Sequence, residues 1–174
     1  TIPKKSTTNR DTNKRIRIAS LNANQIGNNP TKIQECISLC NPDVLCLQET
    51  MSKKLPKIDG YRWITHNTKN RGTAILIDTS TVEEHMVRRN KHPNQHATSI
   101  EITTNKKKIK IINAYLPVYQ GKRNVNKHKE ALSSMIRKIT PNCILVGDLN
   151  GWIETHNNGR SNAHGQNIIS FSGQ

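Results

Sequence analysis

Apolar and basic positions begin to alternate at Arg15, and this change marks where folded structure is expected to start. The first 14 residues, TIPKKSTTNRDTNK, hold one large apolar side chain, Ile2, among Thr, Asn, Lys and Arg. Such a segment buries too little surface to fold, so residues 1–14 are predicted to be a disordered basic arm. Residues 15–20, RIRIAS, show the period-two alternation of a half-buried strand. We therefore expect a single folded domain over residues 15–174.

A helix and a buried strand are predicted next. In residues 30–40, PTKIQECISLC, the Ile and Cys side chains recur at helical spacing after a proline that suits a helix start. The following NPD stops this pattern, and the apolar run VLCL at 44–47 reads as a buried strand.

The middle of the chain is rich in strand patterns and has no helix between them, which indicates antiparallel pairing. A helical pattern at 124–138 then leads to a buried apolar strand at 143–147. Helices at both ends of a strand-rich middle predict two packed sheets with helices outside, an α/β (α+β) architecture. The expected middle strands are 61–65, 73–78, about 82–88, 97–103 and 108–117.

The charge of the chain indicates a binding partner. The chain has 27 Lys and Arg against 12 Asp and Glu, a formal charge of +15, and the basic residues are spread over its whole length. This excess points to a polyanion, with DNA as the leading candidate. A solvated basic surface without a partner and a basic membrane-binding patch remain the alternatives.

The location predicted from the sequence is intracellular. There is no run of 18 apolar residues and no signal-peptide pattern, so a soluble protein without membrane contact is expected. Four cysteines lie in apolar stretches without a CxxC pair, which predicts reduced, mostly buried thiols rather than disulfides or a zinc site. They are Cys36, Cys40, Cys46 and Cys143.

Candidate chemistry gathers where apolar runs end in polar residues. Strand ends meet at one edge of layered α/β proteins, so these residues are expected to converge on one cleft. Taken singly, each has an ordinary explanation as a turn former, a helix start or a core aromatic. The four ends carry Asn22 and Asn24, Gln48 and Glu49, Asn113 and Tyr115, and Asp148 and Asn150.

Together, these side chains provide what phosphodiester hydrolysis requires. Glu49 offers a hard oxygen ligand for Mg²⁺ or Mn²⁺. Asp148 can orient an attacking water or take its proton, and Asn150 and Tyr115 can donate hydrogen bonds to the phosphorane oxygens.

The ordered motifs SLNAN, DVLCLQET, RGTAILI, NAYLP and LVGDLN resemble those of the endonuclease/exonuclease/phosphatase superfamily. Within it, RIRIASLNANQI and PDVLCLQET are most similar to the apurinic-endonuclease-like domain of non-LTR (LINE-type) retrotransposons. The resemblance covers residues 15 to about 150. It implies a DNase I-like four-layer sandwich of two mixed sheets flanked by helices, and a Mg²⁺-dependent (or Mn²⁺-dependent) endonuclease that nicks DNA. It also implies a parent polyprotein with a reverse transcriptase, and a nuclear location when the domain acts on DNA.

The resemblance also assigns roles to residues. It makes Glu49 and Asn22 the metal-binding pair, Tyr115 a contact to the scissile phosphate, and Asp148 and Asn150 the proton acceptor and the oxyanion donor. DNA contacts are expected from Asn24, where some members place a second polar ligand, and from Arg71, which precedes a core strand near the cleft.

One departure from the family pattern concerns the C-terminal side. The family ends with further strands and an SDH-like triplet whose histidine contacts the scissile phosphate, and residues 151–174 contain no such triplet. The last strands are therefore expected to be absent, leaving an exposed sheet edge. His156 and His164 are expected to be surface or loop residues rather than replacements. The alternative function is thus a catalytically inactive DNA-binding module on the same fold.

Overall fold

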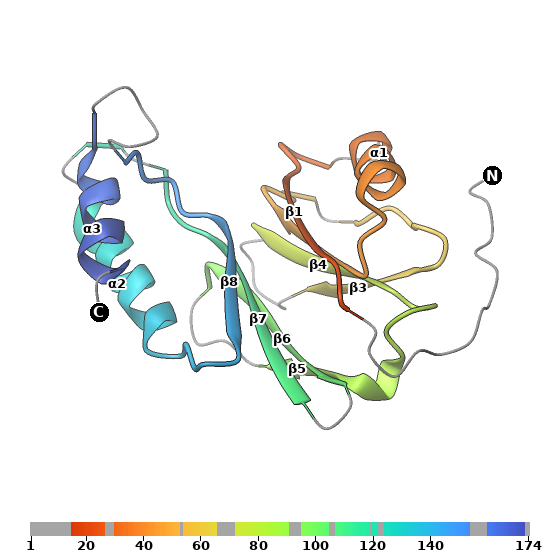
Figure 1. Cartoon of the computed structure of the whole chain (residues 1–174). Coiled ribbons are helices and arrows are strands. Elements are labelled where there is room, and N and C mark those ends of the chain that lie inside the picture. The colour runs from red at the N-terminus through yellow and green to blue at the C-terminus, as the bar shows by residue number, and fades with distance from the viewer. Residues whose placement is uncertain are drawn as a thin grey trace.

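Two four-stranded sheets face one another in the centre of the molecule (Figure 1). The computed structural model describes residues 15–26, 30–52, 54–65, 72–90, 95–104, 107–118, 120–121, 124–153 and 160–172, so the predicted arm lies outside them. The first sheet has the order β1 (Ile18–Asn22), β2 (Val44–Gln48), β4 (Thr73–Asp78) and β3 (Tyr61–Thr65). The second has the order β5 (Val87–Asn90), β6 (Ala97–Thr104), β7 (Lys107–Tyr115) and β8 (Cys143–Asp148).

Each sheet contains one parallel pair. Strands β1 and β2 are parallel and connected through α1 (Thr31–Cys40), while β7 and β8 are parallel and connected through α2 (Val125–Ile136). The remaining neighbours are antiparallel, as predicted. A parallel crossover returns the chain to the same end of the sheet, so the final residues of the two strands lie side by side. In this way Asn22 is level with Gln48, and Tyr115 is level with Asp148.

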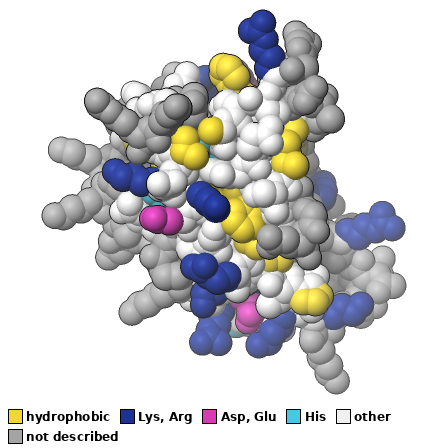
Figure 2. Space-filling model, turned by 90° about the vertical axis from the view of Figure 1, so that its left-hand side faces the viewer, with side chains coloured by type: hydrophobic (Ala, Val, Ile, Leu, Met, Phe, Trp, Pro, Cys, Tyr) yellow, Lys and Arg dark blue, Asp and Glu magenta, His cyan; other side chains and the backbone are white. Residues whose placement is uncertain are grey.

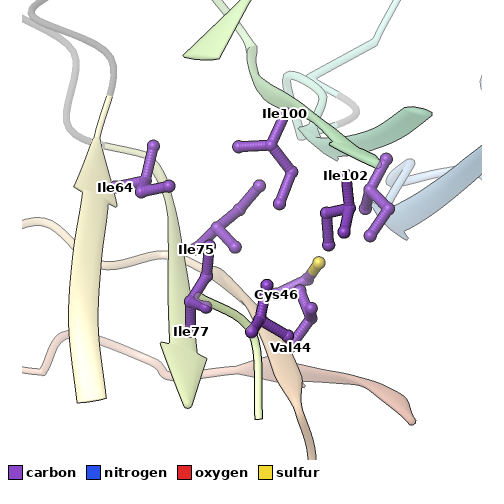
Figure 3. Packing of buried hydrophobic residues seen from close by; sticks show 9 residues of the cluster. Val44, Cys46, Ile64, Ile75, Ile77, Ile100 and Ile102 are labelled. Carbon is purple, nitrogen blue, oxygen red and sulfur yellow. The ribbon is translucent and has the colours of Figure 1, made fainter. Parts of the chain in front are cut away.

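Aliphatic side chains, mostly isoleucine, fill the space between the sheets (Figure 3). Helix α1 packs on the outer face of the first sheet, where Ile33 and Ile37 meet leucines of β2 and β4. Helices α2 and α3 (Ala163–Ser172) cover the outer face of the second sheet. The predicted fold of two mixed sheets between helices is thus confirmed. The layer between the sheets contains Val44, Cys46, Ile64, Ile75, Ile77, Val82, Ile100, Ile102 and Ile111.

Strand β8 differs from its prediction in burial. The sequence predicts a buried strand, but β8 has no fully buried residue, and Ile144 is 41% exposed. The reason is its position at the edge of the second sheet, where only β7 pairs with it among the described strands. Among the described residues, β8 therefore forms the exposed sheet edge that was predicted.

The predicted strand at 82–88 is wrong in its first half. The Asp78 carboxylate accepts hydrogen bonds from the Ser80 backbone N–H and hydroxyl, and the Val82 N–H donates to the Asp78 carbonyl. These bonds make a turn, after which a short 3₁₀ helix, η1 (Glu84–Met86), precedes β5. Local side-chain hydrogen bonds of this kind compete with strand pairing.

The cysteines are free, as predicted, but they are less uniformly buried than expected. Cys46 lies between the sheets, Cys36 and Cys143 are partly buried, and Cys40 is exposed. Cys40 is the last residue of α1, where Asn41 adopts a left-handed conformation and donates to the Ile37 carbonyl. The helix therefore ends at Cys40, whose thiol stays exposed. None of the described helices is long and apolar enough to cross a membrane.

Candidate active site

The layer between the two sheets changes from apolar to polar at one end. Alternate residues of a strand face the same side, so the inward-facing positions can be followed along each of the four strands that end there. Their apolar members pack in the inter-sheet core, and the next inward positions are polar. These series are Ile18, Ser20 and Asn22 in β1; Val44, Cys46 and Gln48 in β2; Ile111, Asn113 and Tyr115 in β7; and Val146 and Asp148 in β8.

Next to the apolar layer, the buried side chains of Gln48 and Asn113 connect the two sheets. Asn113 is 0% exposed and donates through its amide to the carbonyls of Leu47 and Ala74, both at 2.9 Å. Its Oδ1 accepts from Gln48 Nε2 at 2.7 Å. Buried amides with all of these partners stabilise and specify a packing arrangement. Gln48 and Asn113, both candidates from the sequence, therefore form the floor of the site rather than its reactive surface.

Above this floor, two carboxylates converge on one amide group. Asn22 Nδ2 donates to Glu49 Oε1 at 2.9 Å and to Asp148 Oδ2 at 3.1 Å. The Tyr115 hydroxyl donates to the same Glu49 oxygen at 3.2 Å. The prediction that the ends of β1, β2, β7 and β8 meet is thereby supported by direct contacts, although Asn22 and Asp148 are separated by 126 positions in sequence.

The residues that follow the strands adopt left-handed backbone conformations. Glu49 and Asn150 both have φ of 50°, and Asn24 has φ of 44°. The Asn150 N–H donates to Asp148 Oδ1 at 2.9 Å, and its side-chain amide donates to the Leu116 carbonyl at 2.7 Å. Left-handed conformations cost energy in residues other than glycine, and they are retained where a site needs them. Glu49 follows the inward-facing Gln48, so in a regular strand its side chain would point away from the site. The left-handed conformation of Glu49 turns this side chain back toward the site.

Two of the predicted DNA contacts have different outcomes. Asn24 is exposed and its N–H donates to Asn22 Oδ1 at 3.0 Å, so it lies beside the site. Arg71, like His156, lies outside the described residues. The neighbouring Gly72 packs against the Tyr115 ring, since an added Cβ would be 3.0 Å from Tyr115 Cδ1. A small residue at that position gives the Tyr115 ring its place.

Electrostatics keep Tyr115 a hydrogen-bond donor. Burial raises the pKa of the Tyr115 hydroxyl, and the neighbouring Glu49 and Asp148 carboxylates raise this pKa further. The phenol is therefore protonated at neutral pH and can donate to an oxygen that carries negative charge.

The donor set of the site fits a hard divalent cation. Two carboxylates directed at one point create local negative charge, and Mg²⁺ is commonly held by one or two carboxylates together with water and phosphate oxygens. The described residues contain no group of three or more His, Cys, Asp or Glu that could hold a metal ion. Glu49 and Asp148 are the charged oxygen donors available, and Asn22 lies between them.

A buried pair of histidines supports the loop behind the site, and the sequence did not reveal it. His128 in α2 and His164 in α3 are both 0% exposed, and their rings stack with centroids 3.7 Å apart and planes 16° from parallel. His128 Nε2 donates to the Leu149 carbonyl at 2.8 Å, and His164 Nδ1 donates to the Asn150 carbonyl at 3.2 Å. The expectation that His164 is a surface or loop residue is wrong, because α3 packs on α2 and encloses it.

Acidification is expected to destabilise the chain through this histidine pair. Burial lowers the pKa of both rings from the ordinary 6.5. The unfolded chain therefore takes up protons before the folded chain does, so the free energy of unfolding is fully retained above pH 6.5 and falls as the pH drops below it. Each differential proton steepens this fall by up to about 1.4 kcal/mol per pH unit.

Urea unfolding at pH 7.5 and pH 5.5 measures this effect. His128→Gln should flatten the dependence on pH, and His85→Gln, at an exposed histidine, is the matched control. Burial also lowers the pKa of His96, so some dependence is expected to remain in the His128 variant. If the free energy of unfolding fell equally between pH 7.5 and pH 5.5 in the wild type and in His128→Gln, the assignment to the histidine pair would be contradicted.

Comparison with known proteins agrees with this architecture. The profile of the Endonuclease/Exonuclease/phosphatase family matches residues 19–167. No curated protein sequence gives a match. The endonuclease domain of TRAS1, a telomere-specific non-LTR retrotransposon, has a similar structure with a TM-score of 0.66 and 15% identity, over 91% of this chain and 70% of that one.

Other solved structures share the fold at similarly low identity. An AP endonuclease from Archaeoglobus fulgidus has a TM-score of 0.64 and 16% identity, over 91% of this chain and 70% of that one. A humanized TDP2 from D. rerio has a TM-score of 0.56 and 18% identity, over 78% of this chain. The chain spans 62% of the length of that TDP2 and 48% of the TDP2 from C. elegans. The family match covers most of the sequence and coincides with both sheets, so this chain belongs to the endonuclease/exonuclease/phosphatase family.

Proposed function

We propose that this chain is a divalent-metal-dependent DNA endonuclease domain of a retrotransposon protein, which nicks target DNA by hydrolysing a phosphodiester bond. The observation that carries the proposal is the convergence of Glu49 and Asp148 on the Asn22 amide, with the Tyr115 hydroxyl on the same Glu49 oxygen. Phosphodiester hydrolysis needs this combination of a metal-binding carboxylate, a proton acceptor and a hydrogen-bond donor.

The residues present would divide the reaction between them. Glu49, with Asn22, would hold Mg²⁺ or Mn²⁺, which supplies charge stabilisation to the phosphate as a Lewis acid. Asp148 would orient the attacking water and accept its proton. The Tyr115 hydroxyl, which donates to Glu49 in this structure, would turn to donate to a phosphate oxygen. The Asn150 amide, which donates to the Leu116 carbonyl and also hydrogen-bonds Tyr115, would give an N–H to the oxyanion once Tyr115 turns.

Charge and structural neighbours support DNA as the substrate. The chain carries a formal charge of +15, and Figure 2 shows Lys and Arg side chains over the face on which α2 and α3 lie, with few acidic ones. Among the similar structures are a D. rerio TDP2 complexed with single-strand DNA product and a 3′ phosphatase from Neisseria bound to a product DNA hairpin. We further propose a parent polyprotein with a reverse transcriptase and action in the nucleus, because the similar TRAS1 domain comes from a telomere-specific non-LTR retrotransposon.

Nicking of supercoiled plasmid tests the proposal. The wild-type chain with Mg²⁺ should convert supercoiled plasmid to the open circle, and Asp148→Ala should lower this rate by about 10²- to 10⁴-fold, since the proton acceptor is lost. Asp59→Ala is the matched control, because Asp59 is an exposed carboxylate paired only with Lys57 among the described residues. DNA binding without nicking in the wild-type chain would overturn the proposal in favour of an inactive binding module.

A further inference from the structure

Trp152 presents an exposed indole on a fixed backbone, two residues after Asn150 of the candidate active site. Its side chain is 62% exposed, although tryptophan is normally well buried. The backbone N–H of Trp152 donates to Asn162 Oδ1 at 3.1 Å, and its backbone carbonyl accepts from the Asn162 backbone N–H at 3.1 Å. An added Cβ at Gly165 would be 1.8 Å from the Trp152 carbonyl oxygen, so the first turn of α3 packs directly against this peptide. The ring is thus held outward by a backbone that has little freedom.

The position of Trp152 ties it to the reacting groups. It follows Asn150 by two residues and Asp148 by four, and on the first sheet Met51, which is 56% exposed, follows Glu49 by two. Each strand that delivers a carboxylate to the site therefore continues into an exposed apolar side chain. Trp63 is different, because it is partly buried and its Nε1 donates to the Pro56 carbonyl at 2.7 Å. Solvent exposure is accordingly a property of Trp152 rather than of both tryptophans.

We propose that Trp152 stacks on an unpaired nucleobase next to the scissile phosphate, and that the chain therefore prefers DNA with an unstacked base at the cleavage site. This inference rests on the proposed function and narrows its substrate. In the interior of a duplex both faces of a base are covered by its neighbours, so an indole can stack there only on a base that has left the stack. The high positive charge of the chain favours a nucleic acid over an apolar protein as the partner that contacts this ring.

Fluorescence of Trp152 provides a direct readout of stacking. The Trp63→Phe variant retains Trp152 as the single tryptophan, since the chain has two. With EDTA present to prevent cleavage, it is titrated with three labelled 12-mers: a single strand, a blunt duplex, and a duplex with one unpaired base. Anisotropy of the label reports binding independently. If Trp63→Phe fails to fold, the difference between wild type and Trp152→Phe gives the same quenching signal.

The expected results separate this inference from the proposed function. Single-strand and unpaired-base DNA should quench Trp152, and Trp152→Ala should weaken their binding by about 10- to 100-fold while changing blunt-duplex binding less than about twofold. Trp152→Phe should recover most of the affinity, and Leu39→Ala, at an exposed leucine on α1, should change nothing.

Three outcomes would overturn the inference. DNA binding without quenching, or equal weakening of all three DNAs by Trp152→Ala, would exclude base stacking while leaving the endonuclease proposal intact. If no DNA binds by anisotropy, the proposed function fails and the inference fails with it.

Discussion

Replacing Glu49 by glutamine is expected to lower the rate of Mg²⁺-dependent nicking by about 10²- to 10³-fold and to leave the chain folded. The substitution keeps the size of the side chain and an oxygen that can accept from Asn22 and Tyr115, but it removes the negative charge that binds the cation. Glu49 is only partly buried and follows β2 at the open end of the inter-sheet layer, so no apolar packing is lost. Titration calorimetry with Mg²⁺ in the absence of DNA gives a readout that does not depend on activity.

The matched control for this experiment is Glu35→Gln. Glu35 is an exposed carboxylate on α1, and its removal changes the net charge by the same amount. Unchanged nicking and unchanged Mg²⁺ affinity are expected for this variant. If Glu49→Gln kept the Mg²⁺ dependence of the wild type, the metal would have to bind elsewhere and the site described above would not be the metal centre.

Part of the convergence of the site could be predicted from the sequence, because two local rules bring strand ends together within each sheet, although they do not bring the two sheets together. An apolar run that ends in a polar residue locates the end of a strand, and parallel crossovers bring the ends of neighbouring strands together. Asn22, Glu49, Tyr115 and Asp148 satisfy both rules, and the structure places them in contact. The distinction between floor and reactive surface was not predictable, because Gln48 and Asn113 differ from these residues only in depth. Depth depends on how the two sheets pack, which no single strand encodes.

The histidine pair shows a different limit of sequence reasoning. His128 lies on the apolar face of a predicted helix, but its partner His164 is 36 positions away and becomes buried only when α3 packs on α2. A signal was available in Gly165, the residue after His164. Glycine within a helix is unfavourable unless close packing requires it, and here a side chain would overlap the Trp152 carbonyl. The short η1 helix before β5 was missed for a related reason, since the Asp78 side chain directs that turn.

Gly147→Ala is expected to destabilise the chain by about 4 kcal/mol or more and to abolish nicking, although it removes no reactive group. Gly147 has φ of +137° and pairs with Ala114 across β7 and β8. An added Cβ would be 2.0 Å from the Ala114 carbonyl oxygen and 2.8 Å from its nitrogen, both backbone atoms of a central strand that cannot move aside. Asp148 and Tyr115 form the next residue pair between these two strands. Separating β7 from β8 would therefore also move Asp148 away from Tyr115.

Gly60→Ala distinguishes the clash at Gly147 from the cost of its backbone conformation. Gly60 also has positive φ, +79°, but an added Cβ there would meet nothing within 4 Å. Its substitution should therefore cost only about 1 kcal/mol, the conformational term alone. Urea denaturation of both variants gives the comparison directly. Equal losses would mean that β8 can shift away from β7 at little cost, in which case the position of Asp148 would not be fixed by strand pairing. A much larger loss at Gly147 would show that close contact between β7 and β8 holds Asp148 in register with Tyr115.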